Sequence, residues 1–132
     1  MGVSTRKEAL TVVVVEDDAD ARLMYCQYLR SKKCRVYAAA DGRAGIDQAL
    51  ELRPDLIVLD LAMPRVDGWT VLSHLRESSW TADIPIIVCT AITVKPEELL
   101  AAGASACVPK PCTPELIWEY VQALTGPGLR RH

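Results

Sequence analysis

Short apolar runs rich in valine and isoleucine alternate along this chain with longer segments of helical periodicity. The apolar runs predict buried strands at residues 11–16, 35–39, 55–60, 84–90 and 104–109. The amphipathic segments that follow them predict helices at residues 19–32, 43–52, 69–77, 96–102 and 114–124. Strands that alternate with helices form a parallel sheet, and right-handed crossovers put helices on both of its faces. The pattern therefore predicts an α/β fold.

Residues with strong preferences for helix ends support this division. Asp18 is placed to cap the first helix, and Pro54 stops the second. Thr113 followed by Pro114 is typical of the cap and first turn of the last helix. In the first helix we expect one shared face made by Ala21, Met24, Tyr25, Tyr28 and Leu29. In the last helix we expect Trp118 to lie away from the face made by Leu116, Ile117, Tyr120, Val121 and Leu124.

Composition indicates one compact domain. The chain has 132 residues, of which 50% are hydrophobic and 24% charged, an ordinary globular balance. We assign residues 10–125 to the domain, 1–9 to an N-terminal extension and 126–132 to a C-terminal tail or linker stub. A net charge of −2 without a basic stripe argues against direct nucleic-acid binding. No apolar run could span a membrane and no secretory segment is visible, so we expect a cytoplasmic protein.

The five cysteines and two histidines show no metal-binding or disulfide pattern. The cysteines are Cys26, Cys34, Cys89, Cys107 and Cys112, and none forms a C-x-x-C pair. We expect all five to be reduced thiols. His74 and His132 lack partners at ligand spacing and are expected to be solvated.

Polar side chains follow four of the predicted strands. Glu16 and Asp17 follow the first strand, Asp60 the third, Thr90 the fourth and Lys110 the fifth. Because the carboxyl ends of parallel strands meet at one edge of the sheet, we expect these groups to converge there. Three clustered carboxylates repel one another unless a cation lies among them, and Mg²⁺ suits such oxygen ligands. An ammonium and a hydroxyl beside them suit a phosphoryl group, with Asp60 as its acceptor.

Structural explanations compete with these roles. Asp60 could instead cap a turn, and Thr90 could be an ordinary strand residue. Asp18 is better explained as a helix cap than as a metal ligand. Asp67 and Gly68 are typical of a turn.

In this arrangement the chain resembles the receiver domains of two-component response regulators, and the chemotaxis regulators in particular. The resemblance covers about residues 10–125 and implies a flavodoxin-like doubly wound sheet with strand order 2-1-3-4-5. It rests on these motifs in order: Glu16-Asp17, Asp60, Met63-Pro64, Asp67-Gly68, Thr90-Ala91, Gly103-Ala104-Ser105 and Lys110-Pro111.

The resemblance implies a role for each residue of the strand-end set. Asp60 would be phosphorylated by a histidine kinase or a histidine phosphotransfer protein. Mg²⁺ would be held by Asp17 directly, by Glu16 through water, by Asp60 and by the backbone carbonyl of Ala62. Thr90 and Lys110 would contact the phosphoryl oxygens, and the Lys110–Pro111 peptide would be cis.

The chain is thus expected to be a phosphoryl-accepting signalling switch and not a turnover enzyme, with autodephosphorylation left open. One alternative is a phosphorylation-independent interaction module of the same fold. A haloacid-dehalogenase-type phosphatase is disfavoured because that family needs a second Asp where this chain has Ala62. A flavin-binding flavodoxin is disfavoured because the first loop carries acids where a phosphate needs amides and hydroxyls.

Several positions depart from the family pattern. Cys107 stands where relatives usually carry the Tyr or Phe of a rotamer switch. The usual coupling between such a ring and the hydroxyl residue, here Thr90, is therefore not expected. Ala62 and Ile92 stand at positions that adjust the lifetime of the phosphorylated state. Pro109 cannot donate to a ladder, which suits an edge strand.

The resemblance also implies a surface for a homodimer or an output partner, made by the fourth helix, fifth strand and fifth helix. An exposed Trp118 would belong to that surface, although an isolated exposed tryptophan is also normal.

Overall fold

The computed structural model describes residues 9–91 and 93–126, and in this part of the chain five parallel strands form one sheet. The strands are β1 (Thr11–Val15), β2 (Arg35–Ala39), β3 (Leu56–Leu59), β4 (Ile86–Thr90) and β5 (Ala106–Pro109). The helices are α1 (Ala19–Ser31), α2 (Gly42–Leu52), α3 (Gly68–Glu77), α4 (Pro96–Ala101) and α5 (Pro114–Thr125). The strand order is β2-β1-β3-β4-β5, which confirms the predicted flavodoxin-like α/β class.

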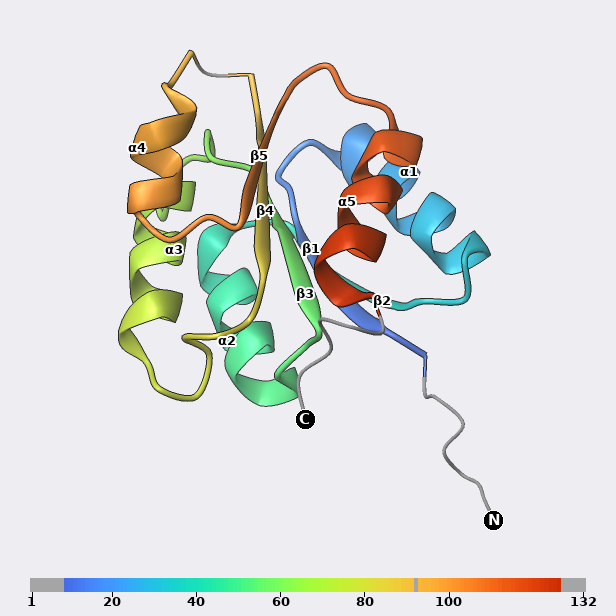
Figure 1. Ribbon diagram of the computed structural model, residues 1–132, viewed down its shortest axis with the longest axis horizontal. Helices are drawn as coiled ribbons and strands as arrows, with labels where there is room; N and C mark the ends of the chain where they lie inside the picture. The colour runs from blue at the N-terminus through green and yellow to red at the C-terminus, as the bar shows by residue number, and fades with distance from the viewer. Residues whose placement is uncertain (1–8, 92, 127–132) are drawn as a thin grey trace.

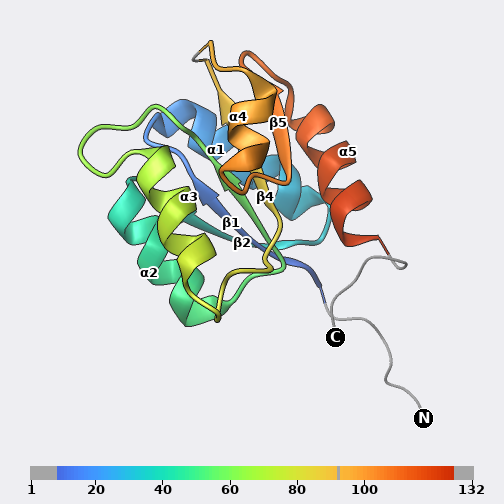
Figure 2. The ribbon, with the colours of Figure 1, turned by 60° about the vertical axis from the view of Figure 1, so that its left-hand side comes forward.

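Helices cover both faces of the sheet (Figures 1 and 2). α1 and α5 lie on one face, and α2, α3 and α4 lie on the other. Alternate residues of each strand point to opposite faces, so the central strands serve two hydrophobic clusters. In β1, Val13 and Val15 belong to the cluster under α2 to α4, while Val12 and Val14 belong to the cluster under α1 and α5. Strands buried on both faces explain why the runs are continuously apolar.

The predicted starts of α1 and α5 are confirmed by their caps, whereas α2 and α3 begin one residue earlier than predicted. The Asp18 side chain accepts a hydrogen bond from the Ala21 N–H at 2.8 Å, so Asp18 is the N-cap of α1. Thr113 accepts from the Leu116 N–H at 3.2 Å and is followed by Pro114 at the first position of α5. Each cap satisfies an N–H that has no partner within its helix.

The predicted strand ends shift by one or two residues. The fourth strand begins at Ile86 and not at Ile84, where the chain still forms a turn with an N–H bond to Thr81 O. Asp60 lies just after β3. β5 is an edge strand, as the missing N–H of Pro109 predicted, and Pro109 itself is exposed.

The predicted faces of two helices are wrong in part. Trp118 is half-buried and packs with Ile117 against the cluster under α1 and α5, whereas Leu116 is 36% exposed. In α1, Met24 is 41% exposed and Cys26 is buried. α1 and α5 contact each other as well as the sheet, so their buried faces are rotated toward one another. A helical pattern in sequence carries no information about that second neighbour.

The remaining predictions about exposure have mixed outcomes. His74 is exposed, as predicted. His132, the N-terminal extension up to residue 8 and the C-terminal tail from residue 127 lie outside the described residues. Among the described helices none is both long and apolar enough to cross a membrane.

Candidate functional site

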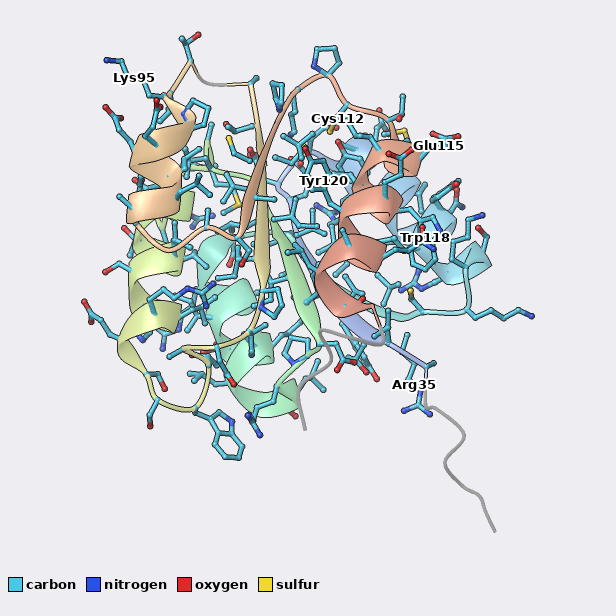
Figure 3. The ribbon with its side chains drawn as sticks, in the orientation of Figure 1. Arg35, Lys95, Cys112, Glu115, Trp118 and Tyr120 are labelled. Carbon is cyan, nitrogen blue, oxygen red and sulfur yellow. The ribbon has the colours of Figure 1, made fainter. Side chains whose placement is uncertain are left out.

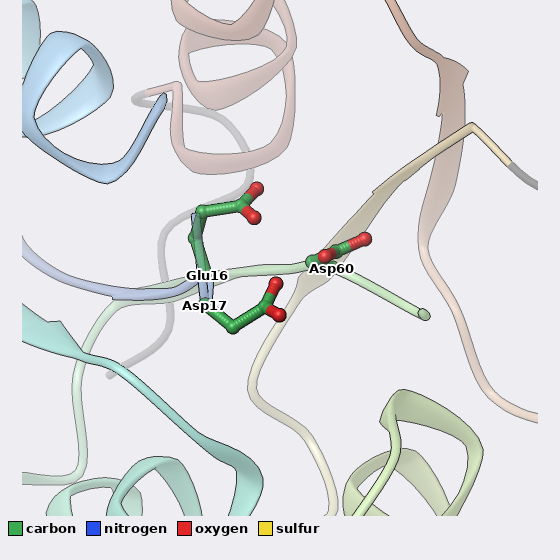
Figure 4. Close-up of side chains that lie close together, drawn as sticks. All are labelled: Glu16, Asp17 and Asp60. Atoms are coloured by element: carbon green, nitrogen blue, oxygen red, sulfur yellow. The ribbon is translucent and has the colours of Figure 1, made fainter. Parts of the chain in front are cut away.

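Three carboxylates meet at the carboxyl edge of the sheet (Figure 4). Glu16 and Asp17 directly follow β1, and Asp60 directly follows the neighbouring strand β3. One carboxylate oxygen of each lies within 4.8 Å of the others, as the sequence predicted. Glu16 is 2% exposed and Asp60 5% exposed, whereas Asp17 is exposed to solvent. The cluster therefore has two buried members and one that faces water.

Lys110 brings a positive charge to the same cluster from the far edge of the sheet. Its Nζ lies 2.7 Å from Glu16 Oε1 and 3.8 Å from Asp60 Oδ2. The residue follows β5, and the Lys110–Pro111 peptide is cis, as the resemblance implied. The structure thus joins Lys110 to residues that lie 94 and 50 positions earlier in the chain.

The cluster carries more negative charge than Lys110 compensates. Burial and the neighbouring charge of Glu16 raise the pKa of Asp60 to about 7, against the opposing effects of Lys110 and the Ala62 N–H. Burial lowers the pKa of Lys110, but the hydrogen bond and charge of Glu16 outweigh it and the pKa is raised overall. Oxygen ligands with uncompensated charge fit a hard divalent cation such as Mg²⁺. The residues present therefore suit the ion that the sequence predicted.

The backbone of the acidic pair is held by contacts that sequence reasoning missed. Arg22 Nη1 donates to the backbone oxygens of Glu16 at 2.8 Å and Asp17 at 3.4 Å. Glu16 Oε2 accepts from the Asp18 N–H at 3.1 Å. The available signal was a basic residue on the first turn of the helix that follows the acids, because one helical turn brings it back over the preceding loop.

Gly68 determines how closely α3 approaches the segment after Asp60. Its N–H bonds to Leu61 O at 2.9 Å. An added Cβ would lie 2.5 Å from Leu61 Cα and 2.6 Å from Asp60 O, both backbone atoms that cannot give way. Asp67 accepts from the Thr70 N–H at 2.9 Å and caps α3. The Asp67-Gly68 pair therefore packs the start of α3 against the candidate acceptor.

Thr90 and Cys107 lie near the same edge. Thr90 is the last residue of β4 and is 3% exposed, and its carbonyl accepts from the Lys110 N–H at 2.9 Å. Cys107 is half-buried beside Val88 of β4. The alternation along β4 and β5 puts Thr90 and Cys107 on the face covered by α4.

Ala62 lies beside the candidate acceptor. Its N–H donates to Asp60 Oδ1 at 3.3 Å. The role of its carbonyl as a metal ligand stays a prediction.

Comparisons with known proteins agree with this geometry. The flavodoxin-like sheet with an acidic cluster at its carboxyl edge places the chain among the doubly wound α/β domains. The family model of the response regulator receiver domain matches residues 12–122 of this chain. The chain therefore belongs to the response regulator receiver domain family.

Individual relatives are similar over nearly the whole domain. The DNA-binding dual master transcriptional regulator RpaA of Synechocystis is 35% identical over 115 residues, which cover 86% of this chain and 48% of RpaA. The chemotaxis response regulator CheY4 of Vibrio cholerae has a TM-score of 0.81 and 30% identity, covering 89% and 99% of the two chains. The receiver domain of the sensor histidine kinase PA1611 of Pseudomonas aeruginosa has a TM-score of 0.81 and 26% identity, covering 90% and 99%. That structure has a magnesium ion coordinated in its active-site cleft.

The chain spans about half the length of curated relatives such as RpaA and the phosphate regulon regulator PhoB of Escherichia coli. The similarity therefore concerns the receiver part of those proteins.

Proposed function

We propose that this domain is a phosphoryl-accepting switch in which Asp60 is the acceptor. The observation that carries the proposal is the position of the Asp60 carboxylate beside both the acidic pair and Lys110 at the carboxyl edge of the sheet. One carboxylate oxygen would attack the phosphorus of a phosphohistidine, and the P–N bond would break to leave an aspartyl phosphate and free histidine. The donor would belong to a histidine kinase or a histidine phosphotransfer protein.

The side chains around Asp60 would position the transferred group. Lys110, already within 3.8 Å of Asp60 Oδ2, would contact one phosphoryl oxygen as a point charge. The Thr90 hydroxyl would hydrogen-bond another from the end of β4. Little covalent chemistry is asked of the protein beyond the Asp60 attack, because phosphoryl transfer depends mainly on positioning and charge neutralisation.

Mg²⁺ is the cofactor that this site would hold. Asp17, Glu16 and Asp60 would supply carboxylate oxygens, with the Ala62 carbonyl as a further ligand. The ion would neutralise charge on the carboxylates and the phosphoryl oxygens. The magnesium in the PA1611 receiver domain supports this part of the proposal.

The wider predictions from sequence remain part of the proposal. Residues 10–125 would form the receiver unit, and the α4-β5-α5 face would serve a homodimer or an output partner. The cytoplasmic location and the absence of direct nucleic-acid or membrane binding stay predictions.

The proposal predicts labelling that depends on one residue and one class of ion. Acetyl phosphate or phosphoramidate with Mg²⁺ should add one acid-labile phosphoryl group, detected by intact mass. Asp60→Asn should abolish it. Asp55→Asn is the matched control, because Asp55 lies at the opposite end of β3 and its side chain accepts a hydrogen bond from the Thr11 N–H at 2.8 Å. Labelling of Asp60→Asn, or labelling that needs no divalent ion, would overturn the proposal.

The same experiment separates the alternative functions. A phosphorylation-independent interaction module would take up no phosphoryl group in the wild type. A haloacid-dehalogenase-type phosphatase would turn over many donor molecules per protein, which Ala62 argues against because it supplies no carboxylate beside Asp60.

A further inference from the structure

Two cysteines close in sequence to Thr90 and Lys110 lie side by side in the structure. Cys89 is the residue before Thr90 in β4, and Cys112 is the second residue after Lys110. Their Sγ atoms lie 2.7 Å apart. Figure 3 shows Cys112 in the segment between β5 and α5, where the chain turns into the helix. A disulfide bond is about 2.05 Å long, so the two sulfurs need only a small movement to form one.

The surroundings of this pair distinguish it from the other cysteines. Cys89 is 1% exposed, whereas Cys112 is partly exposed to solvent. The Tyr25 hydroxyl from α1 lies 3.7 Å from Cys89 Sγ and 3.4 Å from Cys112 Sγ. Cys107 of β5 points to the opposite face of the sheet and packs with the other cluster, so it does not compete for Cys89. All five cysteines have free thiols in this structure.

We propose that Cys89 and Cys112 are a redox-active dithiol that a hydroperoxide converts to a disulfide. This assigns to the domain an oxidant-sensitive site in addition to the acceptor site. A reversible disulfide of this kind is compatible with a reducing compartment, where protein disulfides are mainly transient or sensory.

The difference in exposure between the two thiols determines which of them reacts first with the peroxide. Burial raises the pKa of the Cys89 thiol to about 12, so Cys89 stays protonated and is a poor first nucleophile. The thiolate of the accessible Cys112 attacks the peroxide, and cleavage of the O–O bond leaves a sulfenic acid and releases an alcohol or water. Cys89 then attacks that sulfur while its proton passes to the departing sulfenic oxygen, which leaves as water as the S–S bond forms. Two thiols lose two hydrogens, and one peroxide is reduced.

The disulfide would link the segments that carry Thr90 and Lys110, the two residues proposed to contact the phosphoryl group. This consequence rests on the proposed function. Thr90 O and the Lys110 N–H are already bonded at 2.9 Å, and the S–S bond would close a covalent ring across them. Any adjustment of Thr90 or Lys110 toward a transferred phosphoryl group would be restricted by this ring. The oxidised domain should therefore accept phosphoryl groups more slowly than the reduced domain.

The dithiol is tested without any phosphoryl donor. The reduced 132-residue chain is treated with hydrogen peroxide, denatured and alkylated with N-ethylmaleimide. We expect the loss of two of the five alkylatable thiols, recovery by dithiothreitol, and a Cys89–Cys112 cross-linked peptide. Cys112→Ser and Cys112→Ala should keep all of their remaining thiols, whereas Cys107→Ser should still lose two. Retention of all five thiols in the wild type, or a cross-link through other cysteines, overturns the proposal.

The coupling is tested by labelling with phosphoramidate and Mg²⁺. The initial rate should fall on oxidation of the wild type, return with dithiothreitol and stay unchanged by peroxide in Cys112→Ser. If the disulfide forms and the rate does not change, the coupling is wrong. If no form is labelled, the proposed function fails while the thiol measurement still stands.

Discussion

At the scale of single residues, the site holds carboxylates of like charge close together and largely out of water. Asp60 and Glu16 are both buried, and one lysine contacts both of them. A buried carboxylate beside another carboxylate resists ionisation, because neither water nor a full complement of positive charge stabilises it. Binding a cation or changing the charge of Asp60 should therefore alter the whole domain's stability as well as its chemistry.

The raised pKa of Asp60 predicts a pH-dependent stability without metal. The folded chain keeps this proton between about pH 4 and pH 7, where the unfolded chain has lost it, so the free energy of unfolding falls as the pH rises through that window. Asp60→Asn should therefore be more stable than the wild type at pH 8 in EDTA, by about 1–3 kcal/mol. Urea denaturation at pH 5 and pH 8 measures the difference.

Asp55→Asn is the control for this measurement and should keep the wild-type pH dependence. Added Mg²⁺ should reduce the advantage of Asp60→Asn at pH 8, because the ion stabilises only a site with its carboxylate. An equal pH dependence for wild type and Asp60→Asn would contradict the prediction.

Two adjacent aspartates should separate metal binding from helix capping. Asp17→Ala should weaken Mg²⁺ binding by about tenfold or more, which corresponds to 1.4 kcal/mol. Asp18→Ala should leave Mg²⁺ affinity nearly unchanged but lower the free energy of unfolding by about 0.5–2 kcal/mol, because it removes the α1 cap. Calorimetric titration and urea denaturation measure the two effects. Equal losses of affinity would place the metal ligands one residue out of register.

At the scale of elements, the site depends on where one helix begins. α3 starts at Gly68, and its first turn lies against the backbone of Asp60 and Leu61. A glycine is required there for close approach and not for an unusual backbone angle, since any Cβ would collide with the chain. The same contact sets the path of the acceptor segment.

Gly68→Ala should destabilise the domain by about 1–3 kcal/mol, the usual cost of overpacking. It should also slow labelling at Asp60, because α3 or the acceptor segment must shift. Gly126→Ala is the control, since its Cβ would meet only Gln122 O at 3.0 Å. Wild-type stability and labelling in Gly68→Ala would show that the segment adapts without cost.

At the scale of the whole molecule, a signal must leave the site through elements that can move. Thr90 ends β4, and α4 follows at Pro96 over the same face of the sheet as Cys107. If the domain is the proposed switch, Cys107 offers no ring that could move with the signal. We therefore expect the signal to leave through the Thr90 segment and α4.

Beryllofluoride, a phosphoryl mimic, should shift backbone amide resonances strongly from Thr90 to Gly103. Negative charge at Asp60 draws the Thr90 hydroxyl inward, and the small thiol leaves room for the segment to follow. Cys107→Ser should leave these shifts nearly unchanged, and Thr90→Ala should reduce them. Loss of the response in Cys107→Ser would make the thiol part of the relay.

The sequence by itself determined the order of elements and most of the candidate site. Apolar runs buried on both faces are distinctive, and a parallel sheet brings the residues that follow them to one edge whatever the loops do. Glu16, Asp17, Asp60, Thr90 and Lys110 were found by that rule. The Asp18 and Thr113 caps were also found, because a cap depends only on local residues.

Only the tertiary structure decided which elements touch and how closely. Trp118 turned out to be half-buried because α5 packs on α1 as well as on the sheet. The roles of Arg22 and Gly68 depend on how close they lie to backbone atoms of other segments, and the residue type alone does not reveal such distances. Cys89 and Cys112 are 23 positions apart and have no motif in common, yet the fold brings their sulfurs to within 2.7 Å. Local sequence patterns determine where helices and strands form, whereas contacts between segments far apart in the chain depend on how those elements pack.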